Sequence, residues 1–76
     1  MNTLSQITTL DQWQILYEDE NALLDGPEIH QRKLIALANQ LHTQAVINTG
    51  ELADLLEQAD AAYAWGIEEL QEQRQS

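Results

Sequence analysis

Apolar residues recur every three to four positions over three stretches of the chain, and this spacing predicts helices. In the first stretch, Thr9 followed three residues later by Gln12 is typical of a capping box at a helix start. The segment Asp25-Gly26-Pro27 ends this helix, because Gly adopts the left-handed conformation easily and Pro cannot continue the hydrogen-bond ladder. The first helix is therefore predicted at about residues 10–24. Its inner apolar positions are Leu10, Trp13, Leu16 or Tyr17, and Leu23 or Leu24.

A second helix is predicted at about residues 27–46. Pro27 suits its first turn, where the missing N–H is no loss. The apolar residues that would share its inner face are Ile29, Leu34, Ile35, Leu37, Ala38, Leu41 and Ala45.

The joint that follows carries the clearest local signal. Asn48 is a good N-cap, Glu51 stands three residues later to return the hydrogen bond, and Ile47 and Leu52 are placed for a hydrophobic staple. A third helix is therefore predicted at about residues 49–73. Its inner positions are Leu52, Leu55 or Leu56, Ala59, Ala62 or Tyr63, Gly66 or Ile67, and Leu70.

These elements predict an all-α fold, a small three-helix up-down-up bundle in which short joints make neighbouring helices antiparallel. At about 1.5 Å per residue, the third helix is roughly 37 Å long and the first about 22 Å, so the third overhangs the first. Residues 9–76 are expected to form a single helical domain, and residues 1–8 are expected to be flexible. Whether the bundle is monomeric or a homodimer stays open.

The charge of the chain narrows the class of partner. Thirteen Asp and Glu residues stand against three basic ones, for a net charge of −10, and the only bases are Arg32, Lys33 and Arg74. Such a surface repels nucleic acid and anionic membranes and attracts basic protein surfaces. The chain has no Cys, no signal-peptide pattern and no apolar run long enough to cross a bilayer, so we expect a soluble cytoplasmic protein. If a phage encodes it, this is the cytoplasm of the host cell.

Two groups of acidic residues are candidate partner-binding positions. One group is the cluster Glu18, Asp19 and Glu20. The other follows one outward ridge of the third helix, where positions three and four apart place carboxylates about 5–6 Å from one another, near the spacing of phosphates along a nucleic-acid strand. Its members are Asp54, Glu57, Glu68 and Glu72, with Asp60 and Glu69 beside them. The ridge either mimics nucleic acid toward a basic groove or serves only as a solvated face.

Trp65 is the alternative anchor. It lies off the inner stripe, beside Gly66, in a run of small residues from Ala59 to Gly66. An exposed Trp over small residues favours docking of a partner helix or a second copy. Alternatively, the small residues only allow close packing between helices of the bundle.

The sequence gives little support for catalysis, for metal or cofactor binding, or for direct DNA binding. Ser5 and Ser76, the only serines, lie near the chain ends, and the three glycines are isolated, so neither a nucleophile nor a phosphate loop is indicated. We expect no enzyme activity, no metal and no cofactor. His30 and His42 have no metal-ligand spacing and are expected at the surface or its boundary. Direct DNA binding is rejected, because the segment resembling a recognition helix carries acids and no base.

The sequence thus favours a small acidic inhibitor or regulator that blocks the basic, nucleic-acid-binding surface of a partner protein. In size and charge it is similar to small acidic proteins that phages and mobile elements use against host defence or transcription. No motif carries this similarity. The alternative is a helical adaptor, chaperone or assembly subunit that binds its partner through the apolar face around Trp65.

Overall fold

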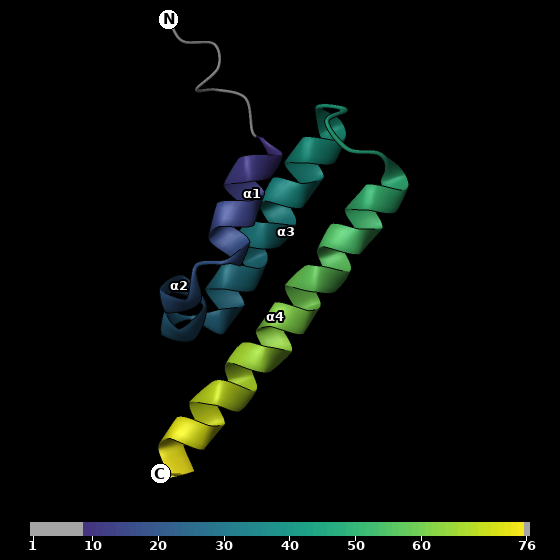
Figure 1. Ribbon diagram of the computed structural model, residues 1–76. Coiled ribbons are helices and arrows are strands. Elements are labelled where there is room, and N and C mark those ends of the chain that lie inside the picture. The colour runs from purple at the N-terminus through teal and green to yellow at the C-terminus, as the bar shows by residue number, and fades with distance from the viewer. Residues whose placement is uncertain (1–8, 76) are drawn as a thin grey trace, which may run out of the picture.

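The computed structural model describes residues 9–75, with side chains as far as residue 73, and this part of the chain is all-α. It contains four helices where three were predicted (Figure 1). They are α1 (Leu10–Tyr17), α2 (Glu20–Asp25), α3 (Pro27–Thr43) and α4 (Thr49–Gln75). The flexibility expected of residues 1–8 concerns a segment outside the described residues.

The predicted helix 10–24 is wrong, because the chain breaks at Glu18 and Asp19. Glu18 caps the end of α1, and the Asp19 carboxylate accepts a hydrogen bond from the backbone N–H of Ala22 at 3.1 Å. Asp side chains compete with the helix for backbone donors, and here Asp19 starts a new helix as its N-cap. The break turns Leu23 inward, whereas a continuous helix would have continued the apolar stripe to Leu24.

α3 ends at Thr43, three residues before the predicted end at residue 46. Ala45 adopts a left-handed backbone conformation, with φ of 62°. The N–H of Ala45 donates to the carbonyl of His42, and the N–H of Val46 donates to that of Leu41. This pair of bonds is a Schellman motif, in which Ala occupies the position that usually holds Gly. Ala45 is consequently exposed and does not lie on the inner stripe of α3.

Both predicted capping boxes are confirmed. At α1, Thr9 Oγ1 accepts from the N–H of Gln12 at 3.2 Å, and Gln12 Oε1 accepts from the N–H of Thr9 at 3.1 Å. At α4, Asn48 and Glu51 exchange the equivalent bonds, both at 2.8 Å. Reciprocal bonds of this kind satisfy two donors that a helix start leaves unpaired. The starts of α1 and α4 are therefore set by residues adjacent in sequence.

The core lies where α1, α3 and the first half of α4 meet. Its buried members are Trp13, Leu34, Ala38, Leu41, Ile47, Leu55 and Ala59. Two residues predicted to face inward do not, since Leu10 is 43% and Ile29 is 58% exposed. Leu10 occupies the first turn of α1, and Ile29 the first turn of α3, where no other helix covers them fully.

Two hydrogen bonds, one buried and one partly buried, join α1 to α3. Trp13 Nε1 donates to the carbonyl of Leu34 at 3.0 Å, and the Trp13 ring stacks on Tyr17 with centroids 5.0 Å apart. His30 Nε2 donates to the carbonyl of Leu16 at 2.7 Å. His30 is only 2% exposed, so the expectation that it lies at the surface or its boundary is wrong. Each bond satisfies a ring N–H in a nonpolar setting, where an unpaired group would cost about 1–3 kcal/mol.

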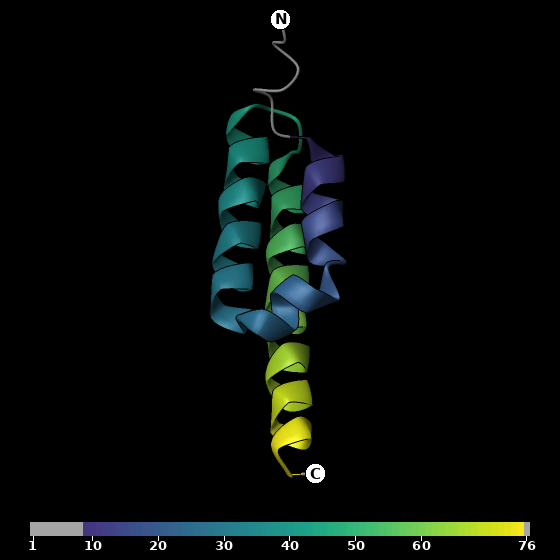
Figure 2. The same ribbon diagram turned by 90° about the vertical axis from the view of Figure 1, so that its left-hand side faces the viewer.

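The three longer helices alternate in direction, and α2 crosses beneath α1 to reach the start of α3 (Figures 1 and 2). At about 1.5 Å per residue, the 27 residues of α4 measure roughly 40 Å. Its last turns project beyond the other helices (Figure 2), whereas the sequence predicted an overhang past the first helix only. Within the described residues, none of these helices is long and apolar enough to cross a membrane.

A candidate protein-binding surface

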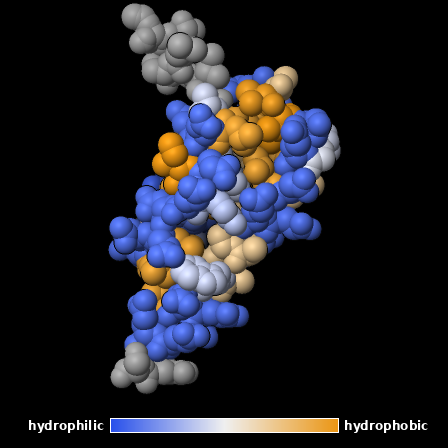
Figure 3. Space-filling model, viewed as in Figure 1, coloured by the Kyte–Doolittle hydropathy of each residue, from blue (hydrophilic) through white to orange (hydrophobic). Residues whose placement is uncertain are grey.

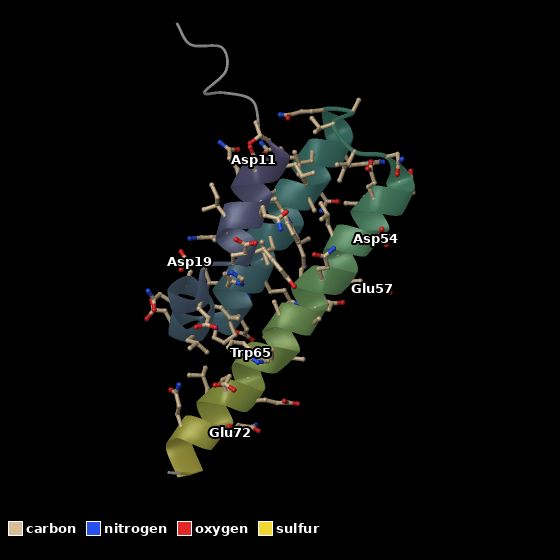
Figure 4. All side chains as sticks on the ribbon, viewed as in Figure 1. Asp11, Asp19, Asp54, Glu57, Trp65 and Glu72 are labelled. Carbon is tan, nitrogen blue, oxygen red and sulfur yellow. The ribbon has the colours of Figure 1, made fainter. Side chains whose placement is uncertain are left out.

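The outer face of α4 carries the predicted acidic ridge. Asp54, Glu57, Glu68 and Glu72 are all exposed. Glu57 lies on the side of α4 turned away from α1 and α3 (Figure 4), whereas Asp54 also borders a hollow that Leu10 of α1 lines. Because 18 residues make five turns, Asp54 and Glu72 point the same way.

Asp60 and Glu69 flank the ridge on opposite sides. Asp60 accepts a hydrogen bond from Gln31 Nε2 at 2.8 Å, so its side chain is turned toward α3. Glu69 is half-buried, on the side of α4 that faces α2. Of the two, Asp60 therefore also helps to hold α3 against α4.

Trp65 lies at the edge of the same face. It is 41% exposed and stands 11 residues, or about three turns, after Asp54, so it points in nearly the same direction. Figure 4 shows Trp65 where α2 comes close to α4. At the same place Figure 3 shows a pale and tan patch framed by hydrophilic side chains. The acidic and apolar candidate surfaces are therefore continuous.

An open groove with a volume of about 410 Å³ lies between the α1–α2 corner and α4. We call it the Trp65 groove. Its wall on α4 consists of Ala61, Ala62 and Trp65. Its opposite wall consists of Tyr17, Glu18, Glu20 and Leu23. The fold thus brings two acidic residues of the Glu18–Glu20 cluster to the exposed tryptophan, although 45 residues separate Glu20 from Trp65 in sequence.

Asp19, the middle member of the Glu18–Glu20 cluster, has a structural role. Its carboxylate caps α2, and it does not line the Trp65 groove. Glu18 Oε2 accepts a bond from Gln14 Nε2 at 3.4 Å, a long contact between exposed side chains. Glu18 and Glu20 therefore remain the acidic residues of this cluster that a groove occupant would meet.

The small residues of α4 serve packing and the groove at different positions. Gly66 is buried, and a Cβ added there would lie 2.8 Å from Leu23 Cδ1 and 3.1 Å from its Cγ. Such distances mean that α2 packs against α4 through this glycine. Ala61 and Ala62 instead leave room in front of Trp65. In the run of small residues, Gly66 therefore serves close packing between helices, and Ala61 and Ala62 belong to the candidate docking surface.

Comparisons with protein-family models, with curated proteins and with solved structures gave no match to this chain.

No three His, Cys, Asp or Glu side chains of residues 9–73 are grouped so that they could hold a metal ion. His42 Nε2 lies 3.3 Å from Thr49 Oγ1, a contact between the end of α3 and the start of α4. His30 donates through Nε2, because a carbonyl oxygen only accepts, and its Nδ1 is buried with no hydrogen-bond partner in this part of the chain.

Two residues of the groove escaped the sequence reasoning. The inner positions were expected to be Leu16 or Tyr17 in the first helix and Ala62 or Tyr63 in the third. Tyr17 does pack against the core, but Tyr17 and Ala62 also line the Trp65 groove. The tendency of Asp19 to act as an N-cap is the signal that could have revealed them. A helix ending at Tyr17 leaves that side chain at an open corner, where no following turn covers it.

Proposed function

We propose that this protein is an acidic inhibitor or regulator that occupies a basic, nucleic-acid-binding surface of a partner protein. The observation that carries the proposal is the outer face of α4, where carboxylates recur from Asp54 to Glu72 with no base between them and Trp65 stands at the edge. Lys and Arg side chains that normally contact phosphates would pair with these carboxylates. The proposal includes no direct binding to nucleic acid or membranes.

The charge density of this face indicates how it would bind. The four ridge carboxylates Asp54, Glu57, Glu68 and Glu72 spread over roughly 27 Å and give one charge per about 7 Å of helix axis. A nucleic-acid strand carries one per about 3.4 Å, and a duplex one per about 1.7 Å. The ridge is therefore sparser than the polyanion it would displace. Charge would speed and orient the encounter, and a desolvated apolar anchor such as Trp65 would supply much of the affinity.

A second candidate function is favoured by the exposure of Trp65 and by the size of its groove. In this alternative the protein is a helical adaptor, chaperone or assembly subunit. The apolar contact around Trp65 selects the partner, and the acidic residues serve only solubility. Removing the charge separates the two functions, because loss of the α4 carboxylates should weaken only the inhibitor's complex, whereas Trp65 contributes to both.

The test uses a partner captured by the full chain from a plausible host lysate and then purified. Added DNA or RNA should release the inhibitor, and binding should weaken steeply with salt. The variant Glu57→Gln/Glu68→Gln/Glu72→Gln should lose binding. The matched control Asp11→Asn/Asp25→Asn/Glu28→Gln removes the same charge away from α4 and should retain most of it.

Other results would contradict the proposal. If nucleic acid does not compete and both triple variants bind like wild type, the charged face is not the interface. If Trp65→Ala then breaks the complex, the adaptor function replaces the inhibitor function.

A further inference from the structure

We propose that the element of the partner that docks here is an amphipathic, Lys- or Arg-bearing helix, and that it lies in the open face between α1 and α4. This inference rests on the proposed function, because it assumes a basic protein partner. It specifies which kind of segment of that partner is bound and where on this protein it lies. The Trp65 groove is one of two hollows that carry it.

The second hollow lies nearer the start of α4 and has a volume of about 180 Å³. We call it the Leu10 hollow. Leu10 of α1 forms one side of it, Ile47 precedes α4, and the rest of its lining comes from α4. The α4 residues concerned are Glu51, Asp54, Leu55 and Gln58. Both hollows are therefore bounded by α4 on one side and by the α1–α2 segment on the other.

The spacing of the two hollows matches a helix. Leu55 lines the Leu10 hollow and Ala62 lines the Trp65 groove, seven residues apart along α4. Seven residues correspond to about 10.5 Å, or two helical turns. A helix lying along α4 would therefore place apolar side chains at positions i and i+7 into the two hollows, which is the anchor pattern of helix-in-groove recognition.

The charges around the hollows determine the occupant. Glu18 and Glu20 border the Trp65 groove, and Glu51 and Asp54 border the Leu10 hollow. The aromatic rings of Tyr17 and Trp65 add surfaces that attract Lys and Arg cations. A second copy of this chain carries −10 and would bring like charge to the same carboxylates. Charge complementarity therefore selects a basic helix rather than a homodimer partner.

The face is open because α1 is held toward α3. The Trp13–Leu34 and His30–Leu16 hydrogen bonds fix α1 on that side, and Leu10 stays 43% exposed. The site is thus formed before binding, which lowers the entropy cost of docking.

The test measures binding of two synthetic peptides to the full chain by isothermal titration calorimetry at low and moderate salt. Both peptides are about five turns long and contain only Leu, Ala and Lys. One places Leu on a single stripe that includes positions i and i+7, and the other distributes the same Leu residues around the helix. The striped peptide should bind more tightly than the dispersed peptide by at least about tenfold.

Variants locate the binding. Trp65→Ala should raise the Kd of the striped peptide by about 30-fold, as expected for a central aromatic anchor. Ala61→Arg, which places a bulky cation in the groove from an exposed position, should also weaken it. Glu18→Gln/Glu20→Gln should raise Kd by about threefold and reduce its salt dependence. Ile15→Ala, at an apolar position that is 70% exposed and lines neither hollow, should leave Kd unchanged.

Three results would overturn the inference. Equal affinity for the two peptides, unaffected by Trp65→Ala, would mean attraction by charge alone. Absence of binding by the striped peptide would also refute the inference. The proposed function has its own test, which is whether nucleic acid releases the native partner. A concentration-dependent dimer in sedimentation equilibrium that Trp65→Ala abolishes would assign the groove to a second copy.

Discussion

The contact between Gly66 of α4 and Leu23 of α2 gives the sharpest test of the packing. A methyl group at residue 66 would approach Leu23 Cδ1 to 2.8 Å and Cγ to 3.1 Å. Leu23 is 4% exposed, so its side chain has little room to withdraw. Because Cγ is close to the backbone of Leu23, the clash cannot be relieved by turning a terminal methyl group alone.

Two opposing contributions set the effect of Gly66→Ala. Replacing Gly by Ala inside a helix stabilises it by about 1 kcal/mol. Inserting a methyl group into a tightly packed contact costs about 1–3 kcal/mol. The steric cost is the larger contribution here, and we expect Gly66→Ala to lower the free energy of unfolding by about 1 kcal/mol.

Removal of Leu23 should reverse the sign. Leu23→Ala eliminates both clashing atoms and by itself costs about 2–4 kcal/mol, as for other buried Leu side chains. In that background Gly66→Ala should raise stability by about 1 kcal/mol, which gives a coupling energy near 2 kcal/mol. Gly50→Ala is the matched control, because a Cβ there meets only Asn48 Oδ1 at an ordinary 3.4 Å.

The assay is urea denaturation of the four proteins of the cycle, followed by far-UV circular dichroism. A stabilising osmolyte added equally to all samples keeps the Leu23→Ala variants folded at the start of the titration. If Gly66→Ala stabilises the wild type as Gly50→Ala does, the close approach of α2 to α4 at this glycine is refuted.

Two further predictions concern the α3–α4 corner and the charge. Ala45→Gly should raise the free energy of unfolding by about 0.5–1 kcal/mol, because Gly removes the left-handed strain of Ala45 at the cost of some chain entropy; a lower urea midpoint would contradict this. Moderate NaCl should raise the melting temperature. On α4, like-charged pairs three or four residues apart each cost about 0.2–0.5 kcal/mol, and salt screens them. These pairs are Glu51–Asp54, Asp54–Glu57, Glu57–Asp60, Glu68–Glu72 and Glu69–Glu72. Recovering about 1 kcal/mol would shift the melting temperature by about 4–8 °C in a chain of this size, and a decrease on adding salt would show that these repulsions are unimportant.

The features that the sequence predicted well depend only on residues that are close together in the chain. The capping boxes at Thr9 and Asn48 need only residues three positions apart, and both form as predicted. The break at Asp19 is different, because continuing the helix and capping a new one differ locally by only about 1 kcal/mol. The packing of Leu23 against Gly66, 43 residues away, favours the break, and a single sequence does not display that contact.

The candidate site likewise combines residues that stand out in the sequence with a groove that does not. Glu18, Glu20 and Trp65 could each be singled out by charge or by position on a helical face. Their common groove could not be predicted, because it depends on where the chain turns after Tyr17. His30 was misplaced for a related reason: its partner is a backbone carbonyl, and a backbone carbonyl leaves no signature in the pattern of side chains.

The two tryptophans occupy opposite environments, and this gives the protein a pair of built-in optical reporters. Trp13 is 1% exposed, hydrogen-bonded and stacked on Tyr17, whereas Trp65 is 41% exposed beside an open groove. An aqueous quencher should therefore extinguish the emission of Trp65 first and that of Trp13 only after unfolding. Folding and occupation of the groove can thus be followed separately in one unlabelled sample.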